Sequence, residues 1–180
     1  MNYYISDTHF GHENVIRFDV RPFSNMEEMW HVMMELWNVR VSNEDDVWIV
    51  GDFAYRADRP ASYYLSRLNG HKHLIIGNHD GVTLKDEESV RHFESIDKMH
   101  HLMDGKNNIV LCHFPIAEWN RMHHGSYHIY GHIHNRKDDT YYFMKKRDRA
   151  LNAGCMINGY MPVTFGELVE NNIRFQTENE

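Results

Sequence analysis

Five short apolar runs in this chain each end at a side chain that can bind a metal ion. The runs cover Asn2 to Ser6, Val47 to Gly51, His73 to Gly77, Ile109 to Cys112 and Tyr127 to Gly131, and the residues that follow them are Asp7, Asp52, Asn78, His113 and His132. Runs of this length and composition predict buried strands. Because ligands of α/β sheets bind at the carboxyl ends of the strands, we expect these side chains to converge on one crevice.

Short motifs around these strand ends strengthen the prediction of a metal site. The motifs are Asp7-Thr8-His9, Gly51-Asp52, Gly77-Asn78-His79-Asp80 and Gly131-His132-Ile133-His134. A glycine before the ligand lets the backbone turn sharply and approach an ion closely. Each motif alone is compatible with an ordinary turn, but all of them in order, each after a strand, favour a single metal site over unrelated turns.

The donor set predicts both the metal and the reaction. Carboxylate, amide and imidazole donors without a thiolate suit manganese, iron, zinc, nickel or cobalt. Asp52 lies alone between two groups of donors, so its two oxygens are expected to bridge two ions about 3.5–4 Å apart. With Asp7, Asp52 and a bridging hydroxide bound, two divalent ions keep a net charge of about +1, which attracts an oxyanion. We therefore expect phosphoester hydrolysis with the bridging hydroxide as nucleophile.

The ordered motifs, together with His113, resemble the signature of the calcineurin-like metallophosphoesterase superfamily. Further stretches resemble its small single-domain bacterial and phage members, namely Asp7-Thr8-His9-Phe10-Gly11-His12, Arg21-Pro22-Phe23 and Tyr160-Met161-Pro162-Val163. The resemblance implies a four-layer sandwich of two mixed β-sheets flanked by helices, whereas the α/β pattern alone does not exclude a doubly wound sheet.

The resemblance also implies a division of the ligands between two divalent transition metal ions, with Mn²⁺ expected. Asp7, His9, Asp52 and His134 would hold the first ion, and Asp52, Asn78, His113 and His132 would hold the second.

Four further residues are expected to act on the substrate. The resemblance assigns His79 the protonation of the departing alkoxide, and the Asp80 carboxylate on its other nitrogen would fix the tautomer. The alternative for His79 is a structural role beside the metals. Gly11 would let the loop after His9 curl back, so that His12 reaches a phosphate, and Asn135 would meet a substrate oxygen.

Composition indicates an ordinary single-domain enzyme. The 180 residues, 42% of them hydrophobic, can form one core over residues 1–180. No run approaches the roughly 18 apolar residues of a membrane span. Two cysteines, Cys112 and Cys155, are too few for a disulfide scaffold, and the first strand begins next to Met1, so we expect a cytoplasmic protein.

The partner expected from the charge is a small phosphoester. A formal net charge of −7 argues against stable nucleic-acid binding, and a homo-oligomer is left open. The expected activity is that of a phosphodiesterase on small phosphodiesters or cyclic nucleotides. A monoester carries more charge, and the loops after the ligands offer only Arg136 as a permanent cation.

The alternatives are a phosphomonoesterase and a metal-dependent nuclease. The complete ligand set disfavours a third, non-catalytic scaffold.

The rest of the chain predicts scaffold elements. A capping box over Ser24 to Glu27 begins a helix through Arg40, and further helices are expected over Ala61–Leu68, Asp86–Ser95 and Thr164–Asn171. We also expect a hairpin turn at Asp104–Asn107 and a solvated hairpin end at the basic cluster of Lys145 to Arg149.

Overall fold

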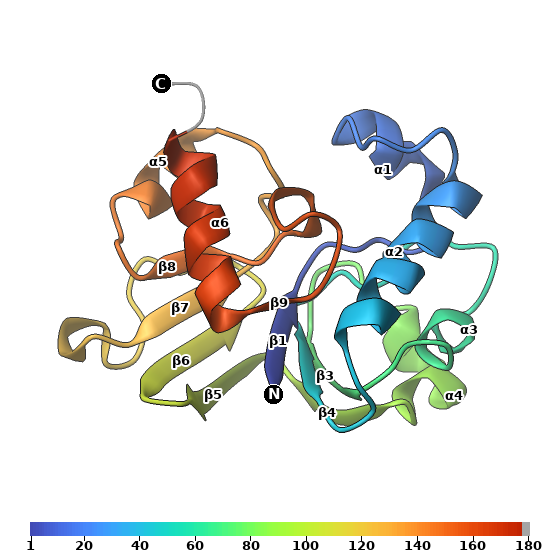
Figure 1. Ribbon diagram of the computed structural model, residues 1–180, viewed down its shortest axis with the longest axis horizontal. Helices are drawn as coiled ribbons and strands as arrows, with labels where there is room; N and C mark the ends of the chain where they lie inside the picture. The colour runs from blue at the N-terminus through green and yellow to red at the C-terminus, as the bar shows by residue number, and fades with distance from the viewer. Residues whose placement is uncertain (178–180) are drawn as a thin grey trace.

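Two stacked β-sheets form the centre of the molecule, which is described here by a computed structural model (Figure 1). The structure describes residues 1–177, and residues 178–180 of the predicted domain lie outside that range. One sheet has the strand order β4-β3-β2-β1-β9 and the other β5-β6-β7-β8. The strands of the first sheet are β1 (Asn2–Ile5), β2 (Asp46–Ile49), β3 (His71–Ile75), β4 (Phe93–Asp97) and β9 (Val163–Thr164). Those of the second are β5 (Met99–Asp104), β6 (Asn107–Cys112), β7 (Tyr127–Tyr130) and β8 (Ala150–Asn152).

Both sheets are mixed, and the strands that precede the candidate ligands are parallel within each sheet. Strands β1 to β4 are parallel, and only β9 runs antiparallel to them. Strands β6, β7 and β8 are parallel, and β5 forms an antiparallel hairpin with β6. The carboxyl ends of β1, β2, β3, β6 and β7 therefore lie on one side of the molecule, the upper side in Figure 1.

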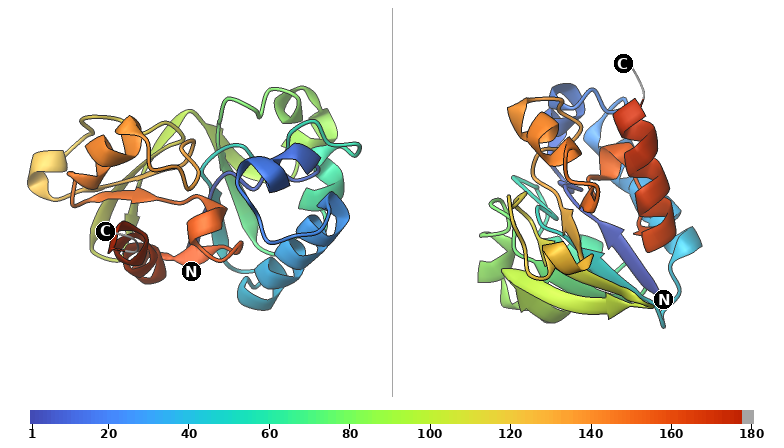
Figure 2. Two further views of the ribbon diagram at one scale, coloured as in Figure 1. Left: turned by 90° about the horizontal axis from the view of Figure 1, so that it is seen from above. Right: turned by 90° about the vertical axis from the view of Figure 1, so that its left-hand side faces the viewer.

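Helices cover the outer faces of both sheets, which completes the four-layer sandwich expected from the sequence (Figure 2). The helices are α1 (Glu13–Phe18), α2 (Met26–Arg40), α3 (Ala61–Leu65), α4 (Glu87–Val90), α5 (Asp139–Lys145) and α6 (Phe165–Thr177). Within residues 1–177 none of these is long and apolar enough to cross a membrane.

Side-chain alternation along the strands builds the separate cores. Ile5 of β1 packs on the side of α2, whereas its neighbour Tyr4 is fully buried between the sheets. In β6, Ile109 and Leu111 share the core between the sheets, and Val110 packs on the α5 side. Successive strand residues point to opposite faces, so each sheet contributes to two cores. This double burial holds the strand ends in fixed positions.

The helix predictions need several corrections. The capping residue of α2 is Asn25, whose side chain accepts from the Glu28 N–H at 2.8 Å, one residue later than predicted. Helix α3 ends at Leu65. The helix expected over Asp86–Ser95 ends at Val90, because Phe93 begins β4 beside Lys72.

The carboxyl-terminal third also differs in part from the predictions. The basic cluster begins at Lys145, the last residue of helix α5, and not at a hairpin end. The Asp138 side chain caps that helix by accepting from the Tyr141 N–H at 3.2 Å. The capping box at Thr164 is confirmed, since its N–H donates to Glu167 at 2.8 Å, but α6 runs to Thr177. The hairpin turn between β5 and β6 is confirmed.

Candidate metal centre

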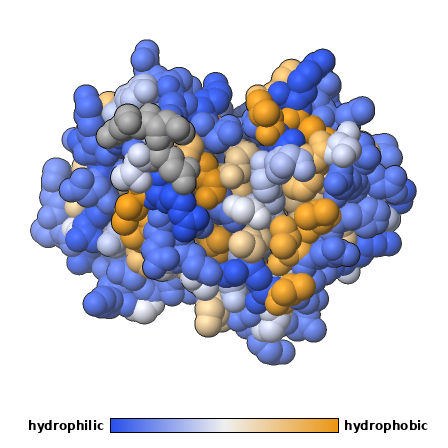
Figure 3. Space-filling view, turned by 45° about the horizontal axis from the view of Figure 1, so that its top comes forward, coloured by the Kyte–Doolittle hydropathy of each residue, from blue (hydrophilic) through white to orange (hydrophobic). Residues whose placement is uncertain are grey.

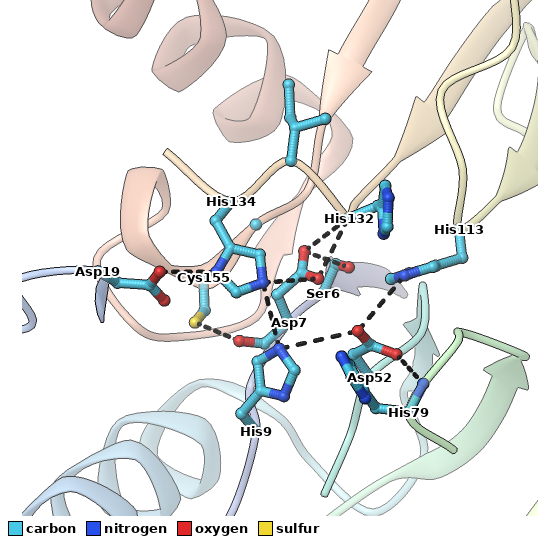
Figure 4. A network of polar contacts seen from close by, with 12 residues as sticks. Ser6, Asp7, His9, Asp19, Asp52, His79, His113, His132, His134 and Cys155 are labelled. Carbon is cyan, nitrogen blue, oxygen red and sulfur yellow. Dashed lines mark hydrogen bonds and ion pairs between the residues drawn. The ribbon is translucent and has the colours of Figure 1, made fainter. Parts of the chain in front are cut away.

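All seven predicted ligands converge where the two sheets meet. Asp7 and His9 follow β1, Asp52 follows β2, and Asn78 follows β3; from the other sheet come His113 after β6, and His132 and His134 after β7. In Figure 4, Asp7 and Asp52 lie between His9 and His134 on one side and His113 and His132 on the other. The structure thus brings together seven side chains that are spread over more than a hundred positions of the sequence, from Asp7 to His134.

Asp52 occupies the position expected of a bridging carboxylate. Its Oδ2 lies 3.8 Å from His9 Nε2 and 3.5 Å from His113 Nε2. Its other oxygen, Oδ1, accepts the backbone N–H of His79 at 2.8 Å, which fixes the carboxylate plane. One carboxylate oxygen therefore faces ligand nitrogens from both sheets.

Each side of Asp52 carries its own group of donor atoms. On one side His9 Nε2 and His134 Nε2 are 3.2 Å apart, and His134 Nε2 is 3.6 Å from Asp7 Oδ1. On the other side the Asn78 side-chain oxygen, Oδ1, lies 3.0 Å from His113 Nε2 and 2.9 Å from His132 Nδ1. Asp7 reaches both sides, because it clusters within 4.8 Å with His9 and His134 and also with Asp52 and His113. The sequence had assigned Asp7 to one ion only.

Hydrogen bonds on the outer side of two histidines direct lone pairs inward. His113 Nδ1 donates to the Val50 carbonyl at 2.9 Å, and His134 Nδ1 donates to Asp19 Oδ1 at 2.7 Å. With Nδ1 protonated, Nε2 of each ring carries a lone pair that points at the centre. Facing lone pairs and buried carboxylates fit a shared cation, so these residues suit a divalent metal.

Burial sets the protonation of the centre. It lowers the pKa of His9 well below its usual range, and it raises the pKa of Asp52 to about 7. Burial also lowers the pKa of His134, but the hydrogen bond that His134 donates to Asp19 and the charge of Asp7 outweigh it, so the net shift is upward. Neutral imidazoles are the form that binds metal, and a bound cation would favour the ionised Asp52.

The backbone at the centre is strained in a way that the sequence did not indicate. Five of the seven predicted ligands have left-handed backbone angles, with φ of 55° at Asp7, 51° at His9, 56° at Asp52, 70° at His132 and 54° at His134. Such conformations are uncommon for residues other than glycine and cluster at functional sites. They turn side chains from successive loop positions toward one point.

Glycines beside the ligands allow the close approach that the motifs predict. A Cβ on Gly77 would lie 2.3 Å from Asp52 Oδ1, and one on Gly131 would lie 1.8 Å from Ser6 Oγ. Neither position has room for a side chain.

Asp80 does not have the place expected from the sequence. Its buried carboxylate accepts backbone N–H groups of Asp52 at 2.9 Å, Phe53 at 2.9 Å and Gly77 at 2.7 Å. Within the described part of the chain the hydrogen-bond partners of this carboxylate are all backbone groups, so it holds the loops after β2 and β3 together instead of orienting the His79 ring. A role for Asp80 in fixing the His79 tautomer was therefore wrong.

An open pocket of about 310 Å³ lies beside the His9 and His134 side of the centre. Its walls include His12, Phe18, Tyr55, Arg56 and His79. His79 is half-buried, its ring lies 4.0 Å from the Tyr55 ring, and burial lowers its pKa. Among residues 1–177 no hydrogen bond to its ring nitrogens is found, which leaves them free for a substrate.

The two predicted substrate contacts have different positions. His12 lines the pocket, and its buried Nδ1 has no hydrogen-bond partner in the described part of the chain. Asn135 is absent from the pocket walls, and its amide donates to the Asp19 carbonyl at 3.5 Å. The geometry thus supports His12 as a substrate contact and makes Asn135 a support of the Asp19 loop.

Sequence reasoning missed the residues that hold the His134 ring in place. Arg21 is 4% exposed and donates to Asp19 Oδ2 at 2.9 Å, to the Asp7 carbonyl at 2.8 Å and to the Thr8 carbonyl at 2.9 Å. Arg21 thereby fixes Asp19, which in turn holds the His134 ring. The Arg21-Pro22-Phe23 motif was the available signal, but it carried no indication of this contact.

Tyr55 and Arg56 were missed as well. Both lie in the loop that continues from Asp52, and Arg56 has a left-handed φ of 48°. Their distance of three and four residues from a ligand was the only sequence signal.

Comparison with known proteins finds relatives of similar sequence and a solved structure of similar fold. The chain is 32% identical over 170 residues to the uncharacterized protein MJ1445 of Methanocaldococcus jannaschii, covering 93% of this chain and 89% of that protein. It is 28% identical to the gene 66 protein of Mycobacterium phage D29, over 74% of this chain and 78% of that protein. Protein AQ665 of Aquifex aeolicus, of unknown function, has a similar crystal structure, with a TM-score of 0.73 and 26% identity over 94% of this chain and 98% of that chain. No protein-family model matches.

The sandwich of two mixed sheets carries the complete ordered set of predicted ligands at its strand ends. The chain belongs to the same family as MJ1445, to which it is 32% identical over 93% of its own length. It is also similar to a mycobacteriophage protein, the gene 66 protein of phage D29.

Proposed function

We propose that this protein is a metal-dependent phosphoester hydrolase with two divalent ions, and that its preferred substrates are small phosphodiesters or cyclic nucleotides. Mn²⁺ is the proposed metal. The observation that carries the proposal is Asp52, one of whose oxygens faces His9 Nε2 at 3.8 Å and His113 Nε2 at 3.5 Å. A carboxylate between two groups of lone pairs is the arrangement that a dinuclear site requires.

Seven side chains would hold the ions. His9, His134 and Asp7 lie on one side, Asn78, His113 and His132 on the other, with Asp52 between them. The chemistry that a bound pair of divalent ions supplies is activation of a water and stabilisation of charge on the phosphoryl oxygens.

The chain's own residues supply the proton transfer and the orientation of the substrate. The His79 ring borders the pocket and has no competing hydrogen bond among residues 1–177, so it can donate a proton to a departing alkoxide or bind a phosphoryl oxygen. His12, which also lines the pocket, can meet a phosphoryl oxygen with the part of its ring that faces the pocket. Asp19 and Arg21 keep the His134 ring in its orientation.

Arg56 supports a second candidate, a phosphomonoesterase. The preference for diesters rested on Arg136 being the only permanent cation near the ligands, but Arg56 also lines the pocket. Its guanidinium lies 5.2 Å from the centre of the Tyr55 ring, and no carboxylate partner for it is found within residues 1–177. Arg136, in contrast, is 3.6 Å from Asp138. A free guanidinium could match the second charge of a monoester.

A turnover panel with Mn²⁺-reconstituted protein tests the proposal. Bis(4-nitrophenyl) phosphate and cyclic nucleotides should show a higher kcat/KM than 4-nitrophenyl phosphate. A tenfold preference for the monoester would make the protein a phosphatase, and preferred cleavage of single-stranded DNA would make it a nuclease. Elemental analysis belongs to the same experiment, because protein that binds no transition metal after reconstitution would contradict the dinuclear site.

A further inference from the structure

Exposed aromatic side chains flank the metal centre on both of its sides. Phe18, at the end of α1, is 66% exposed and lines the same pocket as Tyr55, and both rings are near the His12 ring. Phe114 is 45% exposed, and its ring centre is 4.8 Å from that of His132 and 5.1 Å from that of His113. We call the pair Phe18 and Tyr55 the α1 platform and Phe114 the β6 platform.

The two platforms belong to opposite sides of Asp52. The α1 platform contacts the His9 side, because the Tyr55 ring is 5.0 Å from His12 and 6.4 Å from His9. The β6 platform contacts the His113 and His132 side. Figure 4 shows these two sides separated by Asp7 and Asp52. If the phosphorus atom of a diester lies between the two platforms, each of its two ester arms has one platform beside it.

The surface around the centre combines charge with apolar area. Figure 3 shows a notch between the two halves of the molecule, with hydrophobic residues at the surface on the rim where α1 lies. The centre below is built from imidazoles and carboxylates. A ligand that fits has an anionic middle and flat apolar ends, since aromatic side chains bind planar rings by stacking.

We propose that the substrate is a phosphodiester with a planar ring on each ester arm, of the dinucleoside monophosphate type, and that the α1 and β6 platforms each stack one ring. This inference rests on the proposed function, because it places the phosphodiester at the metal centre. The pocket of about 310 Å³ beside the α1 platform can accept a single nucleoside-sized arm. The net charge of −7 agrees with a short ligand instead of a long nucleic acid.

Binding measurements with two slowly hydrolysed ligands test the proposal without using turnover. One ligand is a dinucleoside phosphorothioate with two bases, and the other is a nucleoside methyl phosphorothioate with one base and the same charge. Their Kd values are measured by calorimetry on Mn²⁺-reconstituted protein. The wild type should bind the two-base ligand at least about tenfold more tightly, which is the expected effect of one additional stacked base.

The double variant Phe18→Leu/Tyr55→Leu and the variant Phe114→Leu should each reduce this ratio to about twofold, because only one platform remains in either of them. The control is Phe143→Leu on α5, an aromatic residue that is 42% exposed and packs against Arg147. It should keep the wild-type ratio. A general loss of structure would weaken both ligands alike and leave the ratio unchanged, and circular dichroism checks the fold.

The outcomes separate this inference from the proposed function. A wild-type ratio below about threefold, or a ratio that falls in only one of the two platform variants, overturns the two-platform model. Hydrolysis of simple diesters can still succeed in that case. Conversely, a ratio that falls in both variants, without any hydrolysis of diesters, would support the platforms and contradict the catalytic proposal.

Discussion

Asp52 is the single residue on which the metal centre depends most. We predict that Asp52→Asn loses most of the activity and weakens both ions, because a neutral amide bridges two cations poorly. His134→Ala should weaken one ion more than the other, since its ring belongs to one side only. Elemental analysis and metal titration of both variants check this. Equal loss of both ions in His134→Ala would contradict the division into two sides.

The effect of a His79 substitution on turnover should depend on the leaving group of the substrate. We predict that His79→Ala keeps both metals and folds normally but loses on the order of 10²–10⁴ in turnover on a substrate with an alkoxide leaving group. With a nitrophenolate leaving group the loss should be smaller, because that group departs with little protonation. Steady-state kinetics on the two substrate types measures the difference. Equal losses would leave His79 as a phosphate-binding residue.

The Arg56 side chain offers a test of whether the protein prefers monoester or diester substrates. We predict that Arg56→Gln lowers kcat/KM for 4-nitrophenyl phosphate by about tenfold, or about 1.4 kcal/mol, and changes the diester rate much less. The matched control is Arg136→Gln, whose guanidinium is already near Asp138. Arg56→Lys should restore part of the monoester rate, because it restores the charge without the planar fork. A monoester loss no larger than the diester loss would exclude Arg56 from charge recognition.

The sequence could predict which side chains the structure brings together at the strand ends but not how each of them is held. Ligand identity follows from side-chain chemistry and position after a strand, and both are visible in the sequence. The left-handed backbone at Asp7 and His134 is not, because neither residue type requires it. The same limit explains Asp80, which is next to His79 in the sequence but turns into the core toward backbone N–H groups.

At the scale of elements, the end of β7 packs directly against the end of β1 from the other sheet. We predict that Gly131→Ala destabilises the fold by about 1–3 kcal/mol and weakens metal binding, because its Cβ would lie 1.8 Å from Ser6 Oγ and 2.7 Å from Asp7 Oδ2. Denaturant unfolding and metal titration measure the two effects. Gly166→Ala in α6 is the control, since nothing lies within 4 Å of its added Cβ. Wild-type metal affinity in Gly131→Ala would show that the ends of β7 and β1 can move apart without moving Asp7.

Elements with strong local patterns were predicted, and those that depend on distant partners were not. The strands that end at ligands are apolar runs bounded by turn residues, and α2 carries its own cap and apolar stripe. Strand β9 has only the residues Val163 and Thr164 and exists because it pairs with β1. Helix α5 lies in a segment whose basic end suggested a turn, and its position depends on packing of Tyr141 and Met144 against the second sheet.

At the scale of the whole molecule, the candidate metal ligands come from both sheets. Asp7, Asp52 and Asn78 come from one sheet and His113, His132 and His134 from the other. We predict that removal of metal by a chelator lowers Tm, because ligands that bind only the folded state stabilise it, by about 2.7 kcal/mol at a free metal concentration of 100 times Kd. Calorimetric scans with and without Mn²⁺ measure the shift. His134→Ala should show a smaller shift, and an unchanged Tm in the wild type would contradict the linkage.

The residues with left-handed backbone angles differ in whether they can be substituted to raise the stability of the protein. A stabilisation screen that relieves unfavourable angles by placing glycine or asparagine would select Asp7, His9, Asp52, His132 and His134 as readily as any other strained position. Gains at those five positions would remove the ligands themselves. Val20, with φ of 53° and 86% exposure, has the same strain on a β-branched side chain outside the ligand set. Efforts to make a more heat-resistant variant of this protein should therefore begin at Val20 and keep the five strained candidate ligands unchanged.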